Sequence, residues 1–164
     1  MYISVVTGIG QGKTELSAFD SALSAAGIYN YNLIPLSSII PPRSKVVKTR
    51  KYRTPDSEYG HKLYVIKADI RSKNIGEHIA AGLGWYQFED GRGVFVEHEV
   101  RELNQRAVLE ATKQRILDSL RDLCTFRHVR YNAQKANMDI ATVVVKESPV
   151  CALSIAVYKA EGWE

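Results

Sequence analysis

The residues near the start of the chain suggest a phosphate-binding loop, because Val5 to Leu16 reads VVTGIGQGKTEL. Such a loop has a glycine, four further residues and then Gly-Lys-Ser/Thr, so that backbone N–H groups surround the phosphates. Gly12 to Thr14 match, but Thr7 stands in the place of the first glycine, and Gly8 is one residue too close. No apolar strand ending in aspartate follows to hold a magnesium ion. The pattern therefore disfavours a nucleotide cofactor and predicts a tight glycine turn between a strand, Tyr2 to Val6, and a helix.

Two further groups have side chains suited to chemistry, an aspartate on the predicted helix and a pair of serines after it. Asp20 lies four residues after Leu16 and three before Leu23, on the apolar side of the helix. Its carboxylate either reaches water at the edge of the apolar stripe or faces a pocket and binds a cation, because an unpaired buried charge is costly. Ser37 and Ser38 precede Ile-Ile-Pro-Pro, and a Ser-Ser pair alone is typical of a turn.

The positive charge is concentrated in one segment. The chain has 164 residues and a formal net charge of +4, and the run RSKVVKTRKYR, from Arg43 to Arg53, contains no acidic residue. Such a run is more typical of a solvated loop or edge strand than of a nucleic-acid surface, and its single aromatic residue, Tyr52, does not make the series of interleaved aromatic side chains that stacks on bases. The sequence therefore disfavours a nucleic-acid partner.

The length and the remaining composition fit one intracellular domain. The chain is long enough for one well-buried domain and short for two. It has no apolar run of membrane-spanning length and no charged leader followed by an apolar core, so we expect a soluble, cytoplasmic protein without a membrane partner. Cys124 and Cys151 form no CxxC pair, and the histidines show no metal-ligand spacing with them. We therefore expect two reduced structural thiols and no metal.

Hydrophobic periodicity predicts an α+β fold in which helices lie outside a packed sheet core. A helix from Thr14 to Ala26 ends at Gly27, and the longest helix, Leu103 to Leu123, carries a continuous apolar stripe. A short helix is predicted from Asn74 to Leu83, where apolar residues recur at intervals of four. Strands are predicted at Tyr2 to Val6, Tyr31 to Pro42, Lys62 to Ile70, Gly93 to Val100, Asp139 to Glu147 and Cys151 to Ala160.

Four stretches together resemble the pyruvoyl-dependent arginine decarboxylases, and the likeness spans essentially the whole chain. They are GxGxGxTxLxAFDxAL from Gly8 to Leu23, GIYNYNLIPLSSIIPP from Gly27 to Pro42, GVFVEHE from Gly93 to Glu99 and CALSIAVY from Cys151 to Tyr158. The most specific part is NLIxxSSIxPP. In that family the glycine-rich segment connects the first strand to the first helix, so the resemblance replaces the nucleotide interpretation.

The resemblance implies an enzyme that makes its own covalent cofactor from Ser38. The Ser38 hydroxyl would attack the carbonyl of Ser37 to give an ester, and elimination would release a chain ending at Ser37. The remaining dehydroalanine would hydrolyse to a pyruvoyl group, so that the single domain of residues 1–164 would become chains 1–37 and 38–164. The fold must align and polarise one peptide bond for this reaction. Asn32 matches the family's amide donor to that site.

The resemblance also assigns roles in a lyase reaction that converts L-arginine to agmatine and carbon dioxide. Glu97 would give a proton to the α-carbon, since burial on an apolar strand favours the protonated carboxyl; its alternative is an exposed carboxylate paired with a basic residue. Asp20 would bind the guanidinium group of arginine through two parallel hydrogen bonds. Leu16 and Leu23 would contact the aliphatic stem of the substrate, and Ile39 follows the pyruvoyl group.

The family's fold implies a four-layer αββα sandwich, assembled as a homotrimer or a dimer of trimers with active sites between subunits. Glu97 would then be able to serve the pyruvoyl group of a neighbour. This chain has Tyr29 and Tyr31 where the family has small residues, and these side chains either narrow the pocket or pack outside it. The open alternatives are a pyruvoyl enzyme for another amino acid, an unprocessed inactive homologue and, from another class, a basic nucleic-acid-binding module. Polyamine synthesis and acid resistance both remain open as the purpose of agmatine production.

Overall fold

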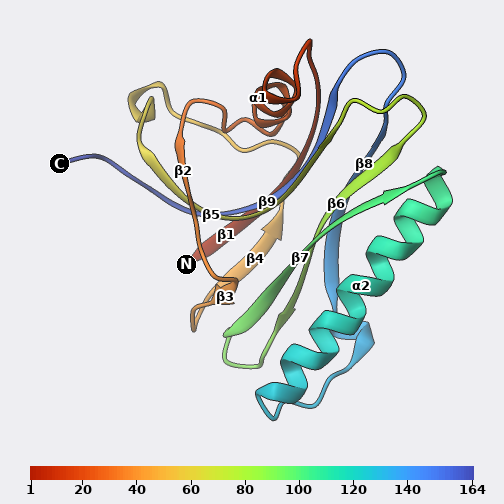
Figure 1. The fold of residues 1–164 in the computed structure, drawn as a ribbon. Helices are drawn as coiled ribbons and strands as arrows, with labels where there is room; N and C mark the ends of the chain where they lie inside the picture. Colours follow the sequence, from red (N-terminus) through yellow and green to blue (C-terminus); the bar gives the residue numbers. More distant parts are fainter.

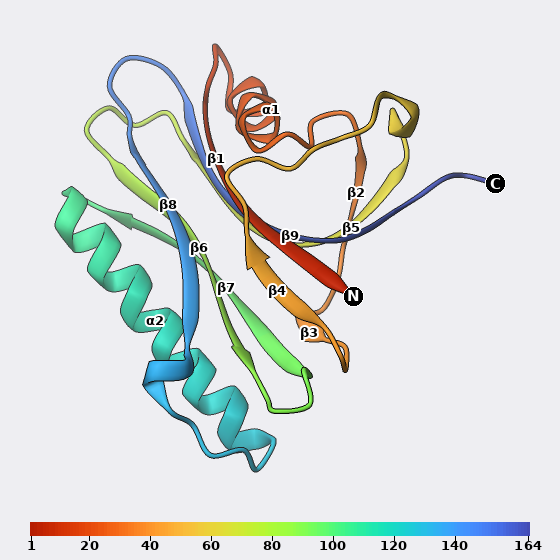
Figure 2. The same cartoon turned by 180° about the vertical axis from the view of Figure 1, so that it is seen from behind.

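The chain forms two β-sheets and two α-helices in one α+β domain, and the computed structural model describes all of it, from Met1 to Glu164 (Figures 1 and 2). The five-stranded sheet has the order β2-β5-β9-β1-β4, and the four-stranded sheet has the order β3-β7-β6-β8. β1 and β4 pair in parallel, as do β2 and β5, and the other pairs are antiparallel. The predicted α+β class is confirmed. The strands are β1 (Tyr2–Gln11), β2 (Asn32–Pro35), β3 (Ile39–Ile40), β4 (Lys45–Lys48), β5 (Lys62–Ser72), β6 (His78–Gln87), β7 (Gly93–Glu102), β8 (Asn137–Val144) and β9 (Val150–Glu161).

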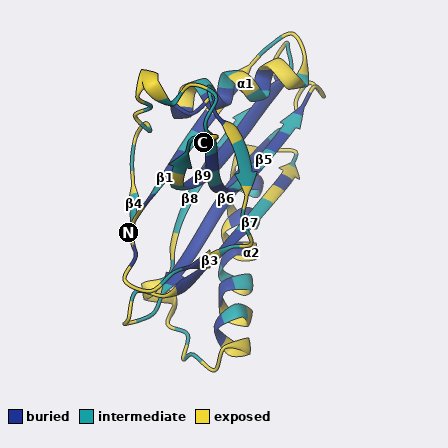
Figure 3. Ribbon diagram, turned by 90° about the vertical axis from the view of Figure 1, so that its left-hand side faces the viewer, coloured by how far each residue is buried: buried dark blue, intermediate teal, exposed yellow.

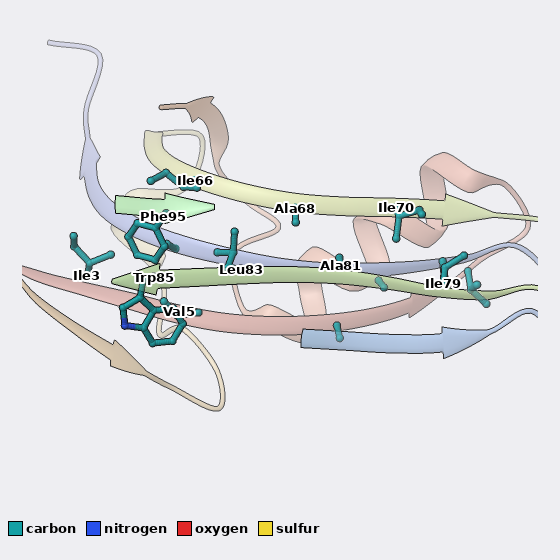
Figure 4. Close-up of a cluster of buried hydrophobic side chains, with 14 of the residues drawn as sticks. Ile3, Val5, Ile66, Ala68, Ile70, Ile79, Ala81, Leu83, Trp85 and Phe95 are labelled. Carbon is teal, nitrogen blue, oxygen red and sulfur yellow. The ribbon is translucent and has the colours of Figure 1, made fainter. Parts of the chain in front are cut away.

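The two sheets pack against each other through the apolar faces of their central strands. Ile66 and Ile70 of β5 and Ile79 and Leu83 of β6 belong to one shared buried cluster. Figure 4 shows these side chains meeting between the strands. Alternate residues of each strand reach this core, because successive side chains of a strand point to opposite faces.

Each helix covers the outer face of one sheet. α1 (Glu15–Ala26) packs on β1, β5 and β9, and α2 (Gln105–Phe126) packs on β6, β7 and β8. Thr14 caps α1 and Asn104 caps α2, each by accepting a hydrogen bond from a backbone N–H of the first turn. Neither helix combines the length and the apolar character needed to cross a membrane. The side of α2 that faces the sheet is buried (Figure 3), and its buried residues are Val108, Thr112, Ile116, Leu120 and Cys124.

The glycine-rich segment lies inside a strand, which corrects the turn predicted from it. β1 continues through Gly8 and Gly10 to Gln11 and pairs with β9 over this length. The glycines are needed because α1 lies very close to β1. A methyl group on Gly8 would overlap the carbonyl oxygen of Ala22, and one on Gly10 would overlap that of Ala18. The glycines therefore permit a close approach of strand and helix.

The helix predicted from Asn74 to Leu83 is wrong, because this segment is a turn followed by the start of β6. Ile79 and Leu83 face the shared core, whereas Gly84 faces α2, where an added methyl group would overlap the side chain of Ile116. Large residues on one face of a strand and small ones on the other also place apolar residues four apart. That spacing is what suggested a helix.

The basic run forms an edge of the five-stranded sheet. It contains β4, whose one neighbour is β1, and the Lys and Arg side chains from Arg43 to Arg53 are all exposed. This is the solvated edge strand that the charge pattern favoured.

Both cysteines are free and buried. Cys124 lies on the buried side of α2, and Cys151 lies on β9 beneath α1. Burial raises the pKa of Cys151 to about 12, so its thiol stays protonated at neutral pH and is a poor nucleophile. The two thiols are therefore structural, as predicted.

We expect Gly10→Ala to destabilise the fold by about 1–3 kcal/mol or more, because the added methyl group meets backbone atoms of α1 that no side-chain movement can clear. Gly162→Ala is the matched control, since a methyl group there makes only ordinary contact, at 3.7 Å, with the His61 ring. Urea unfolding measures both variants. A Gly10→Ala protein as stable as the wild type would contradict the close packing of α1 on β1.

Candidate active site

The chain passes from one sheet to the other at Ser37 and Ser38. β2 ends beside β5 in the five-stranded sheet, and β3 begins beside β7 in the four-stranded sheet. The segment predicted as a single strand, Tyr31 to Pro42, is therefore divided between the sheets. The Ser-Ser pair lies in the short connection where the chain changes sheets.

Ser38 adopts a backbone conformation that is unfavourable for a residue with a side chain. Its φ is 55°, in the left-handed region, which costs a non-glycine residue on the order of 1–3 kcal/mol. Two hydrogen bonds to β7 hold it there. The Ser38 hydroxyl donates to Oε1 of Glu97 at 2.5 Å, and the Ser38 carbonyl accepts from the N–H of Phe95 at 2.8 Å. Both the side chain and the backbone of the second serine are therefore fixed by one strand.

Glu97 lies on the face of β7 that points toward the five-stranded sheet, two residues after the buried ring of Phe95. Its side chain is partly buried, and no Lys, Arg or His forms an ion pair with it. The exposed, ion-paired carboxylate that was its alternative is not what the structure shows. The carboxylate contacts Ser38 of its own chain, so one protomer brings these two groups together.

The ionisable residues that follow Glu97 on β7 lie in other surroundings. His98 points to the opposite face, toward α2, and burial lowers its pKa. Burial raises the pKa of Glu99, whose carboxyl group lies near Asp69 and Lys67 of β5. Neither side chain forms a hydrogen bond with Ser38. Glu97 is thus the one ionisable group of β7 in contact with the serine hydroxyl.

Tyr158 also reaches this end of the space between the sheets, from β9 of the five-stranded sheet. Its hydroxyl donates to the carbonyl of Ile39 at 2.8 Å, and its ring centroid lies 6.4 Å from that of Phe95. Burial raises the pKa of Tyr158 above its ordinary value, and the negative charge of Glu97 adds to the rise. Sequence patterns did not single out Tyr158, although it ends the stretch CALSIAVY. No local spacing signals a hydroxyl that crosses between sheets.

The predicted substrate-binding residues are not brought to Ser38 within one chain. Asp20 is exposed on α1, outside the buried side of that helix, and it forms no ion pair. Its carboxylate therefore reaches water in the single chain, and its predicted place on the apolar side is corrected. Figures 1 and 2 show α1 and β3 toward opposite ends of the molecule. Leu16 and Ile39 are 70% and 51% exposed, whereas Leu23 is buried and only 7% exposed.

The side-chain amide of Asn32 forms a hydrogen bond away from Ser37 and Ser38 in the single chain. It begins β2, where its side-chain amide donates to the carbonyl of Gly60 at 2.7 Å and its backbone N–H donates to the carbonyl of His61 at 2.8 Å. The structure does not bring this amide to the Ser37–Ser38 peptide. A role for Asn32 as a donor there requires its amide to leave Gly60.

The two tyrosines that replace small residues differ in their surroundings. Tyr31 is buried, and its hydroxyl donates to the carboxylate of Glu58. Burial raises the pKa of Tyr31, and the hydrogen bond to Glu58 adds to the rise. Tyr29 is half exposed. Tyr31 therefore packs within its own chain, and Tyr29 is the one open to a bound molecule.

Two kinds of site considered from the sequence, a metal site and a phosphate-binding loop, can be compared with the structure. No group of three or more His, Cys, Asp or Glu side chains is arranged to hold a metal ion. Gly8 and Gly10 pair with β9 as part of a sheet, so their backbone cannot wrap a phosphate.

Comparison with known proteins points to one family. The family model described as pyruvoyl-dependent arginine decarboxylase (PvlArgDC) matches residues 2–161. A pyruvoyl-dependent arginine decarboxylase of Methanococcus vannielii is 39% identical over 84 residues, which are 49% of this chain and 46% of that protein. Proteins of the same name are 35% identical over 96 residues in Halobacterium salinarum, or 58% of each chain, and 51% identical over 49 residues in Methanocaldococcus jannaschii, or 30% of each. The chain thus aligns with about half of the length of the first two relatives.

The range that the family model matches begins at the first residue of β1 and ends at the last residue of β9. It includes both sheets, both helices and the crossing at Ser37 and Ser38, and no part of the candidate site lies outside it. A match over so much of the chain shows that this protein belongs to the pyruvoyl-dependent arginine decarboxylase family.

Proposed function

We propose that this protein decarboxylates L-arginine to agmatine and carbon dioxide with a pyruvoyl group that it makes from Ser38. The observation that carries the proposal is the 2.5 Å hydrogen bond from the Ser38 hydroxyl to Glu97, at a serine held in the left-handed region. Membership of the family supports the reaction, and the aligned relatives are named for it.

The residues present fit a cofactor made at this position. Glu97 would accept the hydroxyl proton of Ser38, whose oxygen attacks the carbonyl carbon of Ser37. The peptide C–N bond breaks, which leaves an ester on the Ser38 oxygen and a free amine on residue 38. Loss of the Ser38 α-proton then expels the Ser37 carboxylate, and water replaces the nitrogen, which leaves as ammonia. The strained backbone and the bond from Phe95 would hold the peptide in one conformation for the first attack.

Cleavage would give chains 1–37 and 38–164 that stay in one fold. The short chain contains β1, which lies between β9 and β4 inside the five-stranded sheet, and β2, which pairs with β5. The long chain begins next to β3, which pairs with β7. The cut therefore falls where the chain changes sheets, and each new end keeps its own sheet neighbour.

A pyruvoyl group supplies a ketone that reacts with the α-amine of arginine and draws electrons from the α-carbon as carbon dioxide leaves. The residues of β7 would orient that group and supply the proton. The N–H of Phe95 already donates to the Ser38 carbonyl, the oxygen next to the ketone, where a fixed donor stabilises negative charge. Glu97, no longer bonded to the serine hydroxyl, would hold the proton that the α-carbon receives.

Recognition of the guanidinium group would come from a second copy of the chain. Asp20 lies on α1, outside the five-stranded sheet, and the Ser38–Glu97 pair lies on the other sheet, so no contact joins the two ends of the site within one protomer. The exposed Leu16 and Ile39 are the apolar surfaces that would meet, and the buried Leu23 would support α1 from beneath. We propose a homotrimer, alone or paired as a dimer of trimers, of four-layer αββα protomers with active sites between subunits.

Self-cleavage is the first expected outcome. Denaturing mass spectrometry of the purified protein should find two fragments, 1–37 and 38–164, whose summed mass equals that of the precursor plus water minus ammonia. Ser38→Ala should remain whole and inactive, because it lacks the attacking hydroxyl. A wild-type chain that stays intact while it decarboxylates arginine would contradict the proposal.

Glu97→Gln should lower the turnover of the cleaved protein by ~10²–10⁴-fold, because an amide fills the same space but cannot donate an acidic proton. Glu99→Gln is the matched control on the same face of the same strand, and its turnover should stay within a few-fold of the wild type. Steady-state kinetics are normalised to the cleaved fraction of each sample. Glu97→Gln should also cleave more slowly, because Glu97 is the proposed base of that step, so only its cleaved fraction is compared. Near-normal turnover by that cleaved fraction would remove Glu97 from the role of proton donor.

Asp20→Asn should lower kcat/KM for arginine by the value of a charge-assisted contact, roughly 1.5–3 kcal/mol. Citrulline has the same shape but no positive charge, so its already low kcat/KM should fall much less. The decisive quantity is the ratio of the two efficiencies in the wild type and in the variant. An unchanged ratio in a fully cleaved sample would mean that the guanidinium group is held elsewhere.

Complementation tests whether Asp20 acts on a neighbour's site. Asp20→Asn and Glu97→Gln chains are each expected to be nearly inactive alone, and co-assembled mixtures should regain part of the activity, because some sites then combine an intact Asp20 with an intact Glu97. Mixtures no more active than the average of the two variants would place Asp20 in the same protomer's site or outside the site.

A further inference from the structure

The residue that would follow the cofactor is held from the opposite sheet. β3 is an edge strand of two residues whose one neighbour is β7. Because Ser38 accepts a hydrogen bond from Phe95, and bonded and non-bonded pairs alternate along an antiparallel ladder, the carbonyl of Ile39, opposite Val94, points away from β7. The hydroxyl of Tyr158 donates to that carbonyl at 2.8 Å. This bond ties β3 to the five-stranded sheet.

Tyr158 is aimed at this point by an irregularity in its own strand. Tyr64 and Val65, adjacent on β5, pair with Lys159 and Val157, so Tyr158 is an extra residue without a partner across the ladder. Such a bulge re-aims a side chain, and bulges are common next to active sites. The Tyr158 ring packs on that of Phe95 at an interplanar angle of 56° and lies against the shared core. The hydroxyl is thus presented by a central strand and a packed ring.

We propose that Tyr158 is a positioning residue for the cofactor: by holding the Ile39 carbonyl it keeps the start of the long chain on β7. This inference rests on the proposed function, because only the cut makes residue 38 a chain end. Before the cut, the chain on both sides restrains Ser38. After the cut, a two-residue ladder and the Tyr158 hydroxyl remain, and chain ends fray unless they are tied down.

If β3 loosens, the carbonyl oxygen of residue 38 is displaced, and this affects catalysis. The carbonyl of residue 38 would leave the N–H of Phe95, so the negative charge that develops there would lose its fixed donor. Arginine binding through the exposed Asp20 of α1 would be unaffected. Loss of the Tyr158 hydroxyl should therefore lower kcat and leave KM unchanged.

Tyr158→Phe removes the hydroxyl and keeps the ring. In the cleaved protein we expect kcat to fall about 2- to 10-fold, the value of one neutral hydrogen bond, with KM for arginine within twofold of the wild type. Tyr131→Phe is the matched control, because the Tyr131 hydroxyl is buried without any hydrogen-bond partner, beneath α2. Its kcat and KM should equal those of the wild type.

Hydrogen–deuterium exchange gives a readout that does not depend on activity. In the cleaved Tyr158→Phe protein, the amides of Phe95, Ile40 and Gly93, which face the ladder between β3 and β7, should exchange several-fold faster than in the cleaved wild type. The amides of β7 that face β6 should be unchanged. In the uncut Ser38→Ala chain, adding Tyr158→Phe should change exchange of the three ladder amides less than twofold, because the chain is continuous there. A purely structural role for Tyr158 would raise exchange equally in the cut and uncut proteins.

The outcomes separate this inference from the proposed function. A wild-type chain that is never cut overturns the proposed function and the role of Tyr158 together. A wild type that is cut and active beside a cut Tyr158→Phe protein with the same kcat and the same exchange at Phe95 overturns the role of Tyr158 alone. A drop in kcat equalled by Tyr131→Phe, or equal exchange changes in cut and uncut chains, also overturns it.

Discussion

The pairing of β3 with β7 holds the candidate site together. The register of this short ladder sets the carbonyl of Ser38 on the N–H of Phe95 and brings its hydroxyl to Glu97. The left-handed backbone of Ser38 costs on the order of 1–3 kcal/mol. A hydrogen bond to a charged group contributes about 1.5–3 kcal/mol and a neutral one about 0.5–1.5 kcal/mol. The two bonds to β7 together are therefore large enough to offset the strain, whereas the neutral bond from Phe95 alone matches only the lower part of that range.

The face that β7 presents to Ser38 depends in turn on how closely the layers pack. β7 pairs with β6 along its whole length, from Gln87 opposite Gly93 to His78 opposite Glu102. A slip of one residue would turn Glu97 toward α2 and put His98 in its place, because adjacent side chains of a strand point to opposite faces. The buried Phe95 prevents this slip, since its ring packs in the shared core, 5.9 Å from the ring of Trp85. Apolar packing thus decides which titratable group meets the serine.

Sequence patterns predicted the parts of this arrangement that have local signals. α1 and α2 have polar caps and apolar stripes, and the Ser-Ser pair and Glu97 lie in stretches with a specific family likeness. The helix expected at Asn74 to Leu83 failed because small and large residues alternate in β6, and the turn expected at Gly8 failed because glycine also permits close approach. The crossing between sheets was missed because an apolar run does not tell which sheet it joins. Helical periodicity predicts the face on which a residue such as Asp20 lies, and it contains no information about distance to a strand in another layer.

On the proposed function, cleavage and turnover have different structural requirements. Cleavage uses Ser37, Ser38 and Glu97, which one folded chain already brings together, so it is an intramolecular reaction that needs no partner. Selection of arginine uses the carboxylate of Asp20. This residue lies on α1, which covers the outer face of the five-stranded sheet. The five-stranded sheet, which α1 covers on its outer face, lies between the two groups, and no contact joins them within one protomer. If the site between subunits that we propose is right, a protomer can make its reactive group before it meets another copy, and the site that selects arginine is completed when two copies come together.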